Sequence, residues 1–129
     1  MPQSNEKMLR DSYEAFGLGD LKPLMDSLSD DIQWRVSGNS PLAGSYTGKD
    51  AVLGLFGKMM ELYKGTLRVR VVDILAKNGR GLVMTKEQAT YQGRTVEFSC
   101  VHVWTARDGK LAEFDVFYDD AYHQFWRQG

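Results

Sequence analysis

The sequence predicts an α+β fold in which three helices cover one face of a mainly antiparallel sheet. Apolar residues recur at helical spacing in the first half of the chain, up to about residue 63. From residue 66 onward they alternate along four stretches, which is typical of strands. The segments "KNGR", "YQGR" and "RDGK" separate these stretches, and each holds an X-Gly pair of the kind that closes hairpins. Four consecutive strands joined by tight turns indicate an antiparallel meander.

Each predicted helix has an apolar stripe and a recognisable end. The first helix ends at "GLGD", the second follows a possible cap at Asp20 and ends at "SDD", and the third runs from about residue 49 to Lys64-Gly65. The three stripes are Met8, Leu9, Ser12, Tyr13 and Phe16; Leu21, Leu24, Met25 and Leu28; and Val52, Leu55, Phe56, Met59 and Met60.

The predicted strands cover residues 32–36, 66–76, 81–91, 94–106 and 110–118, and residues 37–48 are predicted as a loop. Side chains of a strand alternate between its two faces, so each strand has one inward set. The inward sets of the last two strands are Phe98, Cys100, His102 and Trp104, and Ala112, Phe114, Val116 and Tyr118. For strand 81–91 alternation leaves two sets open: Val83, Thr85, Glu87, Ala89 and Tyr91, or Leu82, Met84, Lys86, Gln88 and Thr90.

Length and composition favour one ordinary globular domain over residues 1–129, with a core of about 5–125. The net charge of −1 gives no reason to expect a nucleic acid or an anionic membrane as partner. No apolar run approaches the length of a membrane span, and the first residues lack the apolar core of a secretory signal. The single cysteine, Cys100, excludes an internal disulfide and is interpreted as a small buried hydrophobe. We therefore expect a cytoplasmic protein.

Several stretches resemble a known family. They are "LKPLMDSLSDDIQWRV", the pattern G-x-Y-x-G-x-x-A-V from Gly44 to Val52, and "RDGKLAEFDVFYDD". The chain resembles SnoaL-like, ketosteroid isomerase-like proteins of the nuclear transport factor 2-like superfamily over roughly residues 5–125. This resemblance implies a cone-shaped barrel with a deep apolar pocket, and a homodimer formed through the outer sheet face. The superfamily holds isomerases, cyclases, hydrolases and non-catalytic members, so the fold does not decide the reaction.

His102 and Glu87 are the candidate catalytic residues. The resemblance of the "YQG" segment to the hairpin of the family favours the inward set with Glu87. Both residues are then predicted to face the pocket from adjacent strands, where a carboxylate orients an imidazole and raises its pKa for acid–base work. By resemblance, His102 stands where ketosteroid isomerase-like proteins place an oxyanion-stabilising acid, while the general base position corresponds to Val36, which has no carboxylate. The alternative is that His102 is a core residue without a catalytic role, whose ring nitrogens form hydrogen bonds with a backbone or tyrosine group.

Aromatic and apolar residues form the candidate ligand-binding wall, and each could equally be plain core. They are Tyr13, Trp34, Tyr46, Phe56, Met59, Phe98, Trp104, Phe114, Val116 and Tyr118. These residues favour a flat apolar or aromatic ligand. Loop 37–48 is interpreted either as a flap over the opening of the predicted pocket or as an ordinary surface loop.

No cofactor and no metal are predicted. The metal candidate, Asp119, Asp120 and His123 in the tail, is a weak signal. The resemblance also disfavours epoxide hydrolysis, because Val116 takes the place of an aspartate and Asp115 points outward; the direction of the arginine candidate, Arg35, stays open. Three functions remain: cofactor-independent acid/base chemistry on a small apolar carbonyl-type substrate, a non-catalytic module that binds a small hydrophobic molecule, and a dimeric interaction protein with a vestigial pocket.

Overall fold

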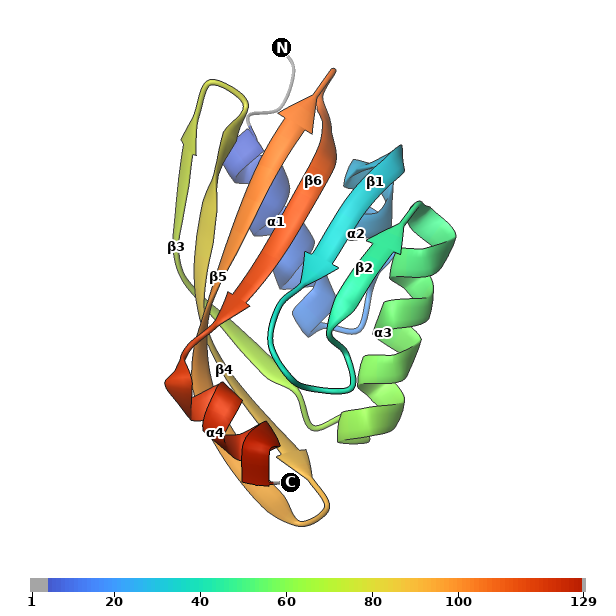
Figure 1. Ribbon diagram of the computed structural model, residues 1–129. Coiled ribbons are helices and arrows are strands. Elements are labelled where there is room, and N and C mark those ends of the chain that lie inside the picture. Colours follow the sequence, from blue (N-terminus) through green and yellow to red (C-terminus); the bar gives the residue numbers. More distant parts are fainter. Residues whose placement is uncertain (1–4, 129) are drawn as a thin grey trace.

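The computed structural model describes residues 5–128, and it shows helices packed against one six-stranded sheet (Figure 1). The helices are α1 (Asn5–Gly17), α2 (Lys22–Ser27), α3 (Lys49–Tyr63) and α4 (Asp120–Gln128). None of them is long and apolar enough to cross a membrane. The first three precede the long strands, and α4 follows the last strand near the far end of the sheet (Figure 1). The predicted α+β class is confirmed.

The sheet has the strand order β2-β1-β6-β5-β4-β3. Its strands are β1 (Leu28–Val36), β2 (Gly44–Thr47), β3 (Arg68–Lys77), β4 (Arg80–Tyr91), β5 (Arg94–Arg107) and β6 (Lys110–Tyr118). The last four form the predicted antiparallel meander, whereas β1 lies parallel to β6. The sheet is therefore mixed, and β4 and β5 occupy interior positions within it.

The three predicted hairpin turns form as two-residue loops. Both loop residues have positive φ in each turn, for example 55° at Asn78 and 76° at Gly79. This conformation is that of a type I′ turn, whose twist matches that of the strands it joins. The turns fix the register of the meander, and a one-residue slip would reverse the face of every side chain.

Two local predictions are wrong. Leu28, predicted on the second helix, begins β1 and pairs with Leu111 of β6, because long-range strand pairing overrides local helical spacing. The predicted loop 37–48 contains strand β2, which pairs antiparallel with β1 through Tyr46 opposite Trp34. The polar, glycine-rich composition of this segment conceals a short edge strand.

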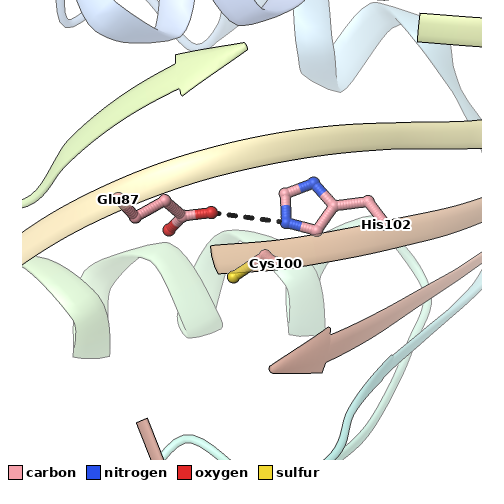
Figure 2. A group of neighbouring side chains, drawn as sticks. All are labelled: Glu87, Cys100 and His102. Carbon is pink, nitrogen blue, oxygen red and sulfur yellow. Dashed lines mark ion pairs between the residues drawn. The ribbon is translucent and has the colours of Figure 1, made fainter. Parts of the chain in front are cut away.

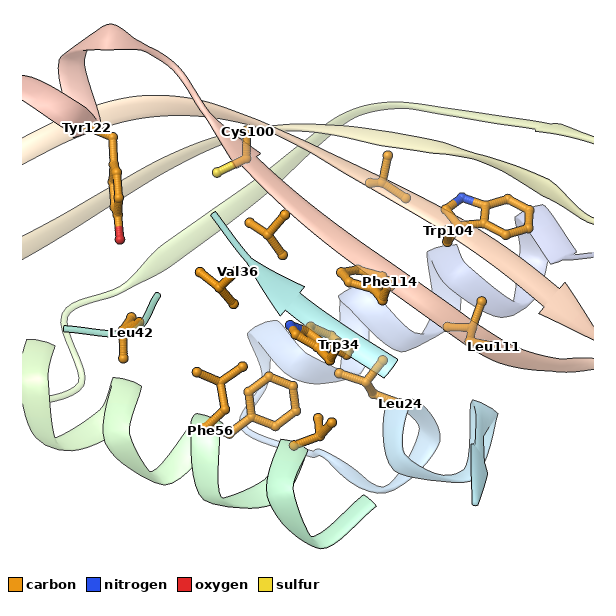
Figure 3. Close-up of a cluster of buried hydrophobic side chains, with 14 of the residues drawn as sticks. Leu24, Trp34, Val36, Leu42, Phe56, Cys100, Trp104, Leu111, Phe114 and Tyr122 are labelled. Carbon is orange, nitrogen blue, oxygen red and sulfur yellow. The ribbon is translucent and has the colours of Figure 1, made fainter. Parts of the chain in front are cut away.

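The core lies between the helices and the inward face of the sheet (Figure 3). Val52, Leu55 and Phe56 on α3 are buried against it, as their helical spacing predicts. Across the parallel strand pair, Trp34 stacks on Phe114 with ring centroids 3.9 Å apart. The burial patterns of β4, β5 and β6 bear out all three predicted inward sets.

Candidate active site

His102 lies on the inward face of β5, between Cys100 and Trp104 along the same face. Only 12% of its side chain is exposed. A polar ring at this depth needs hydrogen-bond partners, because burying an unsatisfied polar group is costly. Two partners reach it, one from the neighbouring strand and one from α1.

Glu87 on β4 is the first partner. Its Oε2 lies 3.6 Å from Nε2 of His102, and its side chain is 8% exposed (Figure 2). Across the ladder Glu87 is opposite Phe98 and His102 is opposite Val83, so the two side chains meet by extending along the inward face between these positions. Thr85, two residues earlier on the same face, donates a 2.6 Å hydrogen bond from Oγ1 to Oε2 of Glu87. The structure thus brings the two predicted catalytic residues together.

The carboxyl group of Glu87 is held in its ionised form. Burial is the largest influence, and alone it would raise the pKa of this group. The contacts with His102, Thr85 and Cys100 outweigh burial, so that the pKa lies below its ordinary value. At neutral pH a negative charge therefore stands beside the imidazole.

Tyr13 on α1 is the second partner of His102. Its hydroxyl group forms a hydrogen bond with Nδ1, and the two rings stack with centroids 5.7 Å apart. Burial, followed by the nearby charge of Glu87, raises the pKa of the Tyr13 phenol well above its usual range. The phenol therefore stays protonated and can serve as a hydrogen-bond donor.

The three groups form one polar chain, Glu87–His102–Tyr13, drawn from β4, β5 and α1. The carboxylate lies beside the imidazole, and the imidazole in turn contacts the phenol. Such a chain can move a proton between its ends while its charges stay compensated. Chemically, it can donate a proton to a bound oxygen or take one back.

The polar chain opens onto a mostly apolar cavity of about 80 Å³. Seven of the ten predicted wall residues line this cavity: Tyr13, Trp34, Phe56, Met59, Phe114, Val116 and Tyr118. Glu87 and His102 line it as well. For comparison, a cavity of about 150 Å³ suffices to bind benzene, so the present space admits only a small molecule unless its walls move.

Tyr46, Phe98 and Trp104 do not line the cavity. The Tyr46 hydroxyl donates to the Leu42 carbonyl 2.7 Å away. Phe98 packs edge-on against Tyr118 and Tyr122, and Trp104 is 1% exposed within the core. Alternation gives Phe98 and Trp104 the correct face, but it does not say where along the sheet the cavity lies, and Tyr46 falls in the predicted loop.

Sequence reasoning misses seven of the lining residues: Ser12, Phe16, Leu24, Val36, Leu42, Leu55 and Val69. Four of them belong to the predicted helical stripes, so a signal for their burial is present. The helical spacing of apolar residues predicts that they are buried, but it does not predict which of them face a cavity and which contact other side chains. Val36 takes the place of the carboxylate that the resemblance implies, and it adds to the apolar wall.

A second hollow adjoins the cavity on the outside, with a volume of about 370 Å³. Phe16, Phe56, Met59 and Val69 line both spaces, so these four side chains separate them. Rotation of the flexible Met59 side chain would join the two spaces. This wall is the candidate entrance for a ligand, which a smaller side chain at Met59 would test.

The other charged candidates lie elsewhere. Arg35 faces outward and binds Asp115 and Glu113 across the parallel strands, with 3.0 Å between Nη2 of Arg35 and Oε1 of Glu113. Asp119 accepts hydrogen bonds from the backbone N–H groups of Ser99 and Tyr122 at the start of α4. The outward Arg35–Asp115 pair gives no support to an epoxide hydrolase arrangement.

Comparison with known proteins identifies the family. The model described as the SnoaL-like domain matches residues 9–114. The chain belongs to the SnoaL-like domain family. This SnoaL-like domain is 27% identical over 122 residues to an uncharacterised protein of Mycobacterium tuberculosis, covering 92% of this chain and 93% of that one.

Solved structures share the fold. An NTF2-like protein of unknown function from Burkholderia pseudomallei has a TM-score of 0.86 at 24% identity, with 98% of this chain and 100% of that chain covered. A protein from Jannaschia described as a SnoaL-like polyketide cyclase has a TM-score of 0.74 at 12% identity, with coverage of 92% and 91%. The likeness to the Burkholderia protein shows that the SnoaL-like domain has an NTF2-like fold, as the resemblance of the sequence implies.

Proposed function

We propose that this SnoaL-like domain binds a small apolar carbonyl compound and transfers a proton on it without a cofactor. The observation that carries the proposal is the Glu87–His102–Tyr13 chain in the wall of an apolar cavity. An apolar pocket with a few convergent polar groups is the usual form of a small-molecule site. Isomerases and cyclases that act on carbonyl compounds need a hydrogen-bond donor where negative charge develops on oxygen.

Each of the three residues has a separate role. With Glu87 ionised, a protonated His102 donates from Nε2–H toward the carboxylate and from Nδ1–H to the Tyr13 oxygen. The Tyr13 O–H then points its proton toward a substrate oxygen in the cavity. When that proton moves to the substrate, the Nδ1 proton replaces it on Tyr13 and leaves a neutral imidazole. In the reverse direction the same chain acts as a base, and positioned acid–base groups of this kind accelerate reactions about 10²–10⁴-fold.

The second candidate function is ligand binding without turnover. One observation favours it: among residues 5–128, Glu87 is the single carboxylate that lines the cavity, and it is engaged by His102 and Thr85. A second carboxylate that could remove a proton from carbon is absent from this part of the wall. In a binding module, Tyr13 would donate a hydrogen bond to the ligand and the chain would move no proton.

A panel of small apolar ketones, enones and epoxides distinguishes the two functions. We expect ketones and enones to raise the melting temperature of the protein and to be converted, and His102→Gln to abolish conversion. The control is His123→Gln, since His123 is the second of two histidines and lies outside the cavity. Binding across the panel without any conversion would favour the binding module, and absence of binding would contradict both functions.

We also propose that two copies pair through their outer sheet faces, in the cytoplasm. Leu75, Leu82 and Val103 stand side by side across β3, β4 and β5, and the next row includes Met84 and Phe117. Phe117 is 49% exposed, and such a continuous apolar face is typical of a protein contact. Sedimentation of Val103→Arg should show a monomer where the wild type shows a dimer; a monomeric wild type would contradict pairing.

A further inference from the structure

We propose that Glu87, Cys100 and His102 form a binding site for one zinc-type divalent metal ion. The metal candidates that the sequence offers, Asp119, Asp120 and His123, lie near the end of the chain. Glu87, Cys100 and His102 come together only in the folded protein. One ligand atom from each of the three residues, including Sγ of Cys100, lies within 4.8 Å of the other two (Figure 2). The inference goes beyond the proposed function, because it involves Cys100, which the proton transfer does not use.

The spacing suits a tetrahedral ion. Bonds of about 2.0–2.3 Å from zinc to nitrogen, oxygen and sulfur place tetrahedral ligand atoms about 3.3–3.7 Å apart. The 3.6 Å between Oε2 of Glu87 and Nε2 of His102 already lies in this range. The remaining distances, at most 4.8 Å, need a closure of about 1 Å, which a small side-chain rotation supplies.

The backbone beneath the group is rigid. Cys100 and His102 are two residues apart on the inward face of β5, and Glu87 projects from the adjacent strand β4. Both strands are interior to the sheet. Sites built on such elements keep their geometry better than sites on loops.

Two outer contacts already hold the ligands in place. The Tyr13 hydroxyl contacts Nδ1 of His102, which leaves Nε2 for a metal, and Thr85 donates to Glu87 at 2.6 Å. Contacts of this kind orient metal ligands and fix the histidine tautomer. Glu87 and His102 also line the cavity, so that a fourth position would face it, as in zinc sites that keep one position for water or a ligand.

The charges balance. A glutamate, a thiolate and a neutral imidazole together carry two negative charges, which a divalent ion neutralises within an apolar environment. On binding, the thiol proton of Cys100 passes to the buffer, together with any proton that Nε2 of His102 holds. The sulfur, nitrogen and oxygen donors favour zinc or cobalt over magnesium or calcium, which prefer all-oxygen sites. Because the metal would use Nε2 of His102, it would also halt the proposed proton transfer.

Cobalt(II) titration of protein freed of metals with EDTA tests the site. We expect one ion per chain, an absorption band of a cobalt–thiolate bond, the visible bands of tetrahedral cobalt, and loss of all of them when zinc is added. Cys100→Ser should remove the thiolate band and weaken binding more than about tenfold, since even outer contacts of metal ligands are worth 10–100-fold. His123→Gln should bind cobalt as the wild type does.

Absence of the thiolate band in the wild type at millimolar cobalt would overturn the proposal. It would also fall if Cys100→Ser kept wild-type affinity, or if His123→Gln lost it. The wild-type spectrum requires no variant to fold, and far-UV circular dichroism checks each variant. The readout needs no turnover, so it stands or falls independently of the carbonyl assay.

Discussion

Glu87→Gln tests whether a carboxylate charge is stabilised inside the cavity wall. The substitution keeps the size of the side chain and one acceptor oxygen, so it removes mainly the charge. Oε2 of Glu87 has two partners, Thr85 at 2.6 Å and His102 at 3.6 Å. Hydrogen bonds to charged groups contribute roughly 1.5–3 kcal/mol, against about 0.5–1.5 kcal/mol for neutral ones. With about 1 kcal/mol lost at the Thr85 hydrogen bond and a similar amount at the His102 charge contact, the free energy of unfolding should fall by about 2 kcal/mol at pH 7.

The pH dependence makes this prediction specific. The pKa of Glu87 is lower in the folded protein than its ordinary value, so its charge stabilises the fold above the unfolded pKa of about 4.3. This stability is lost as the pH falls through the lower, folded pKa. The difference between wild type and Glu87→Gln should therefore be present at pH 7 and shrink as the pH falls below about 4.

Urea unfolding with EDTA present, followed by tryptophan fluorescence at pH 7, 5 and 3.5, measures the difference. Glu97→Gln is the matched control, because Glu97 is exposed on the outer face of β5. Its substitution should change the free energy of unfolding by less than about 0.5 kcal/mol. A Glu87→Gln variant as stable as the wild type at pH 7, or a difference that does not change with pH, would refute the reasoning, since burial would then keep the carboxyl neutral.

Three further changes test the packing around the site. A Cβ atom at Gly81 would lie 1.9 Å from the Leu75 carbonyl oxygen, so Gly81→Ala should lower the free energy of unfolding, measured in urea, by about 3 kcal/mol or more. The control Gly57→Ala has open space around the new Cβ atom and should be neutral or stabilising. Equal effects of the two substitutions would contradict the close approach at Gly81. Met59→Ala shortens a side chain that lies between the cavity and the outer hollow, so the variant should bind bicyclic ketones that the wild type excludes, as measured by thermal shift. If wild type and variant bind ketones of the same maximum size, Met59 does not close the entrance. Tyr13→Phe leaves Nδ1 of His102 without its partner and should cost about 1–3 kcal/mol in thermal unfolding, and a variant of wild-type stability would argue against that hydrogen bond.

Much of the fold follows from local pattern. The X-Gly turns and the two-residue period predict the inward face of β5, and with it the placement of His102. For β4 alternation leaves two sets open, and the resemblance of its hairpin to that of the family favours the set with Glu87. The contact of these two residues does not follow from the register, because Glu87 is opposite Phe98 and His102 is opposite Val83, four positions along β4 from Glu87. The parallel pairing of β1 with β6 that incorporates Leu28 is not local, and no spacing within either segment specifies it.

The rest of the site depends on packing between distant elements. The contact of Tyr13 with His102 joins residues 89 positions apart, and it depends on how α1 lies against the sheet. Cys100 is correctly predicted as buried, but alternation alone does not show that its sulfur lies near Glu87 and His102. The position of the cavity along the sheet, which leaves out Tyr46, Phe98 and Trp104, is likewise set by side-chain volumes from several elements.

Hydrogen exchange at carbon tests the central claim most directly. A ketone that binds in the cavity is incubated with the protein and EDTA in D2O, and deuterium at its α-carbon is followed by NMR. A proton donated from Tyr13 to the carbonyl oxygen makes the α-hydrogen easier for solvent water to remove. The Glu87–His102–Tyr13 chain therefore predicts exchange with the wild type and at least about a 100-fold slower rate with His102→Gln, which is the lower range for loss of a general acid or base. A wild-type rate no faster than buffer, or an equal rate with His102→Gln, would contradict proton transfer through this chain.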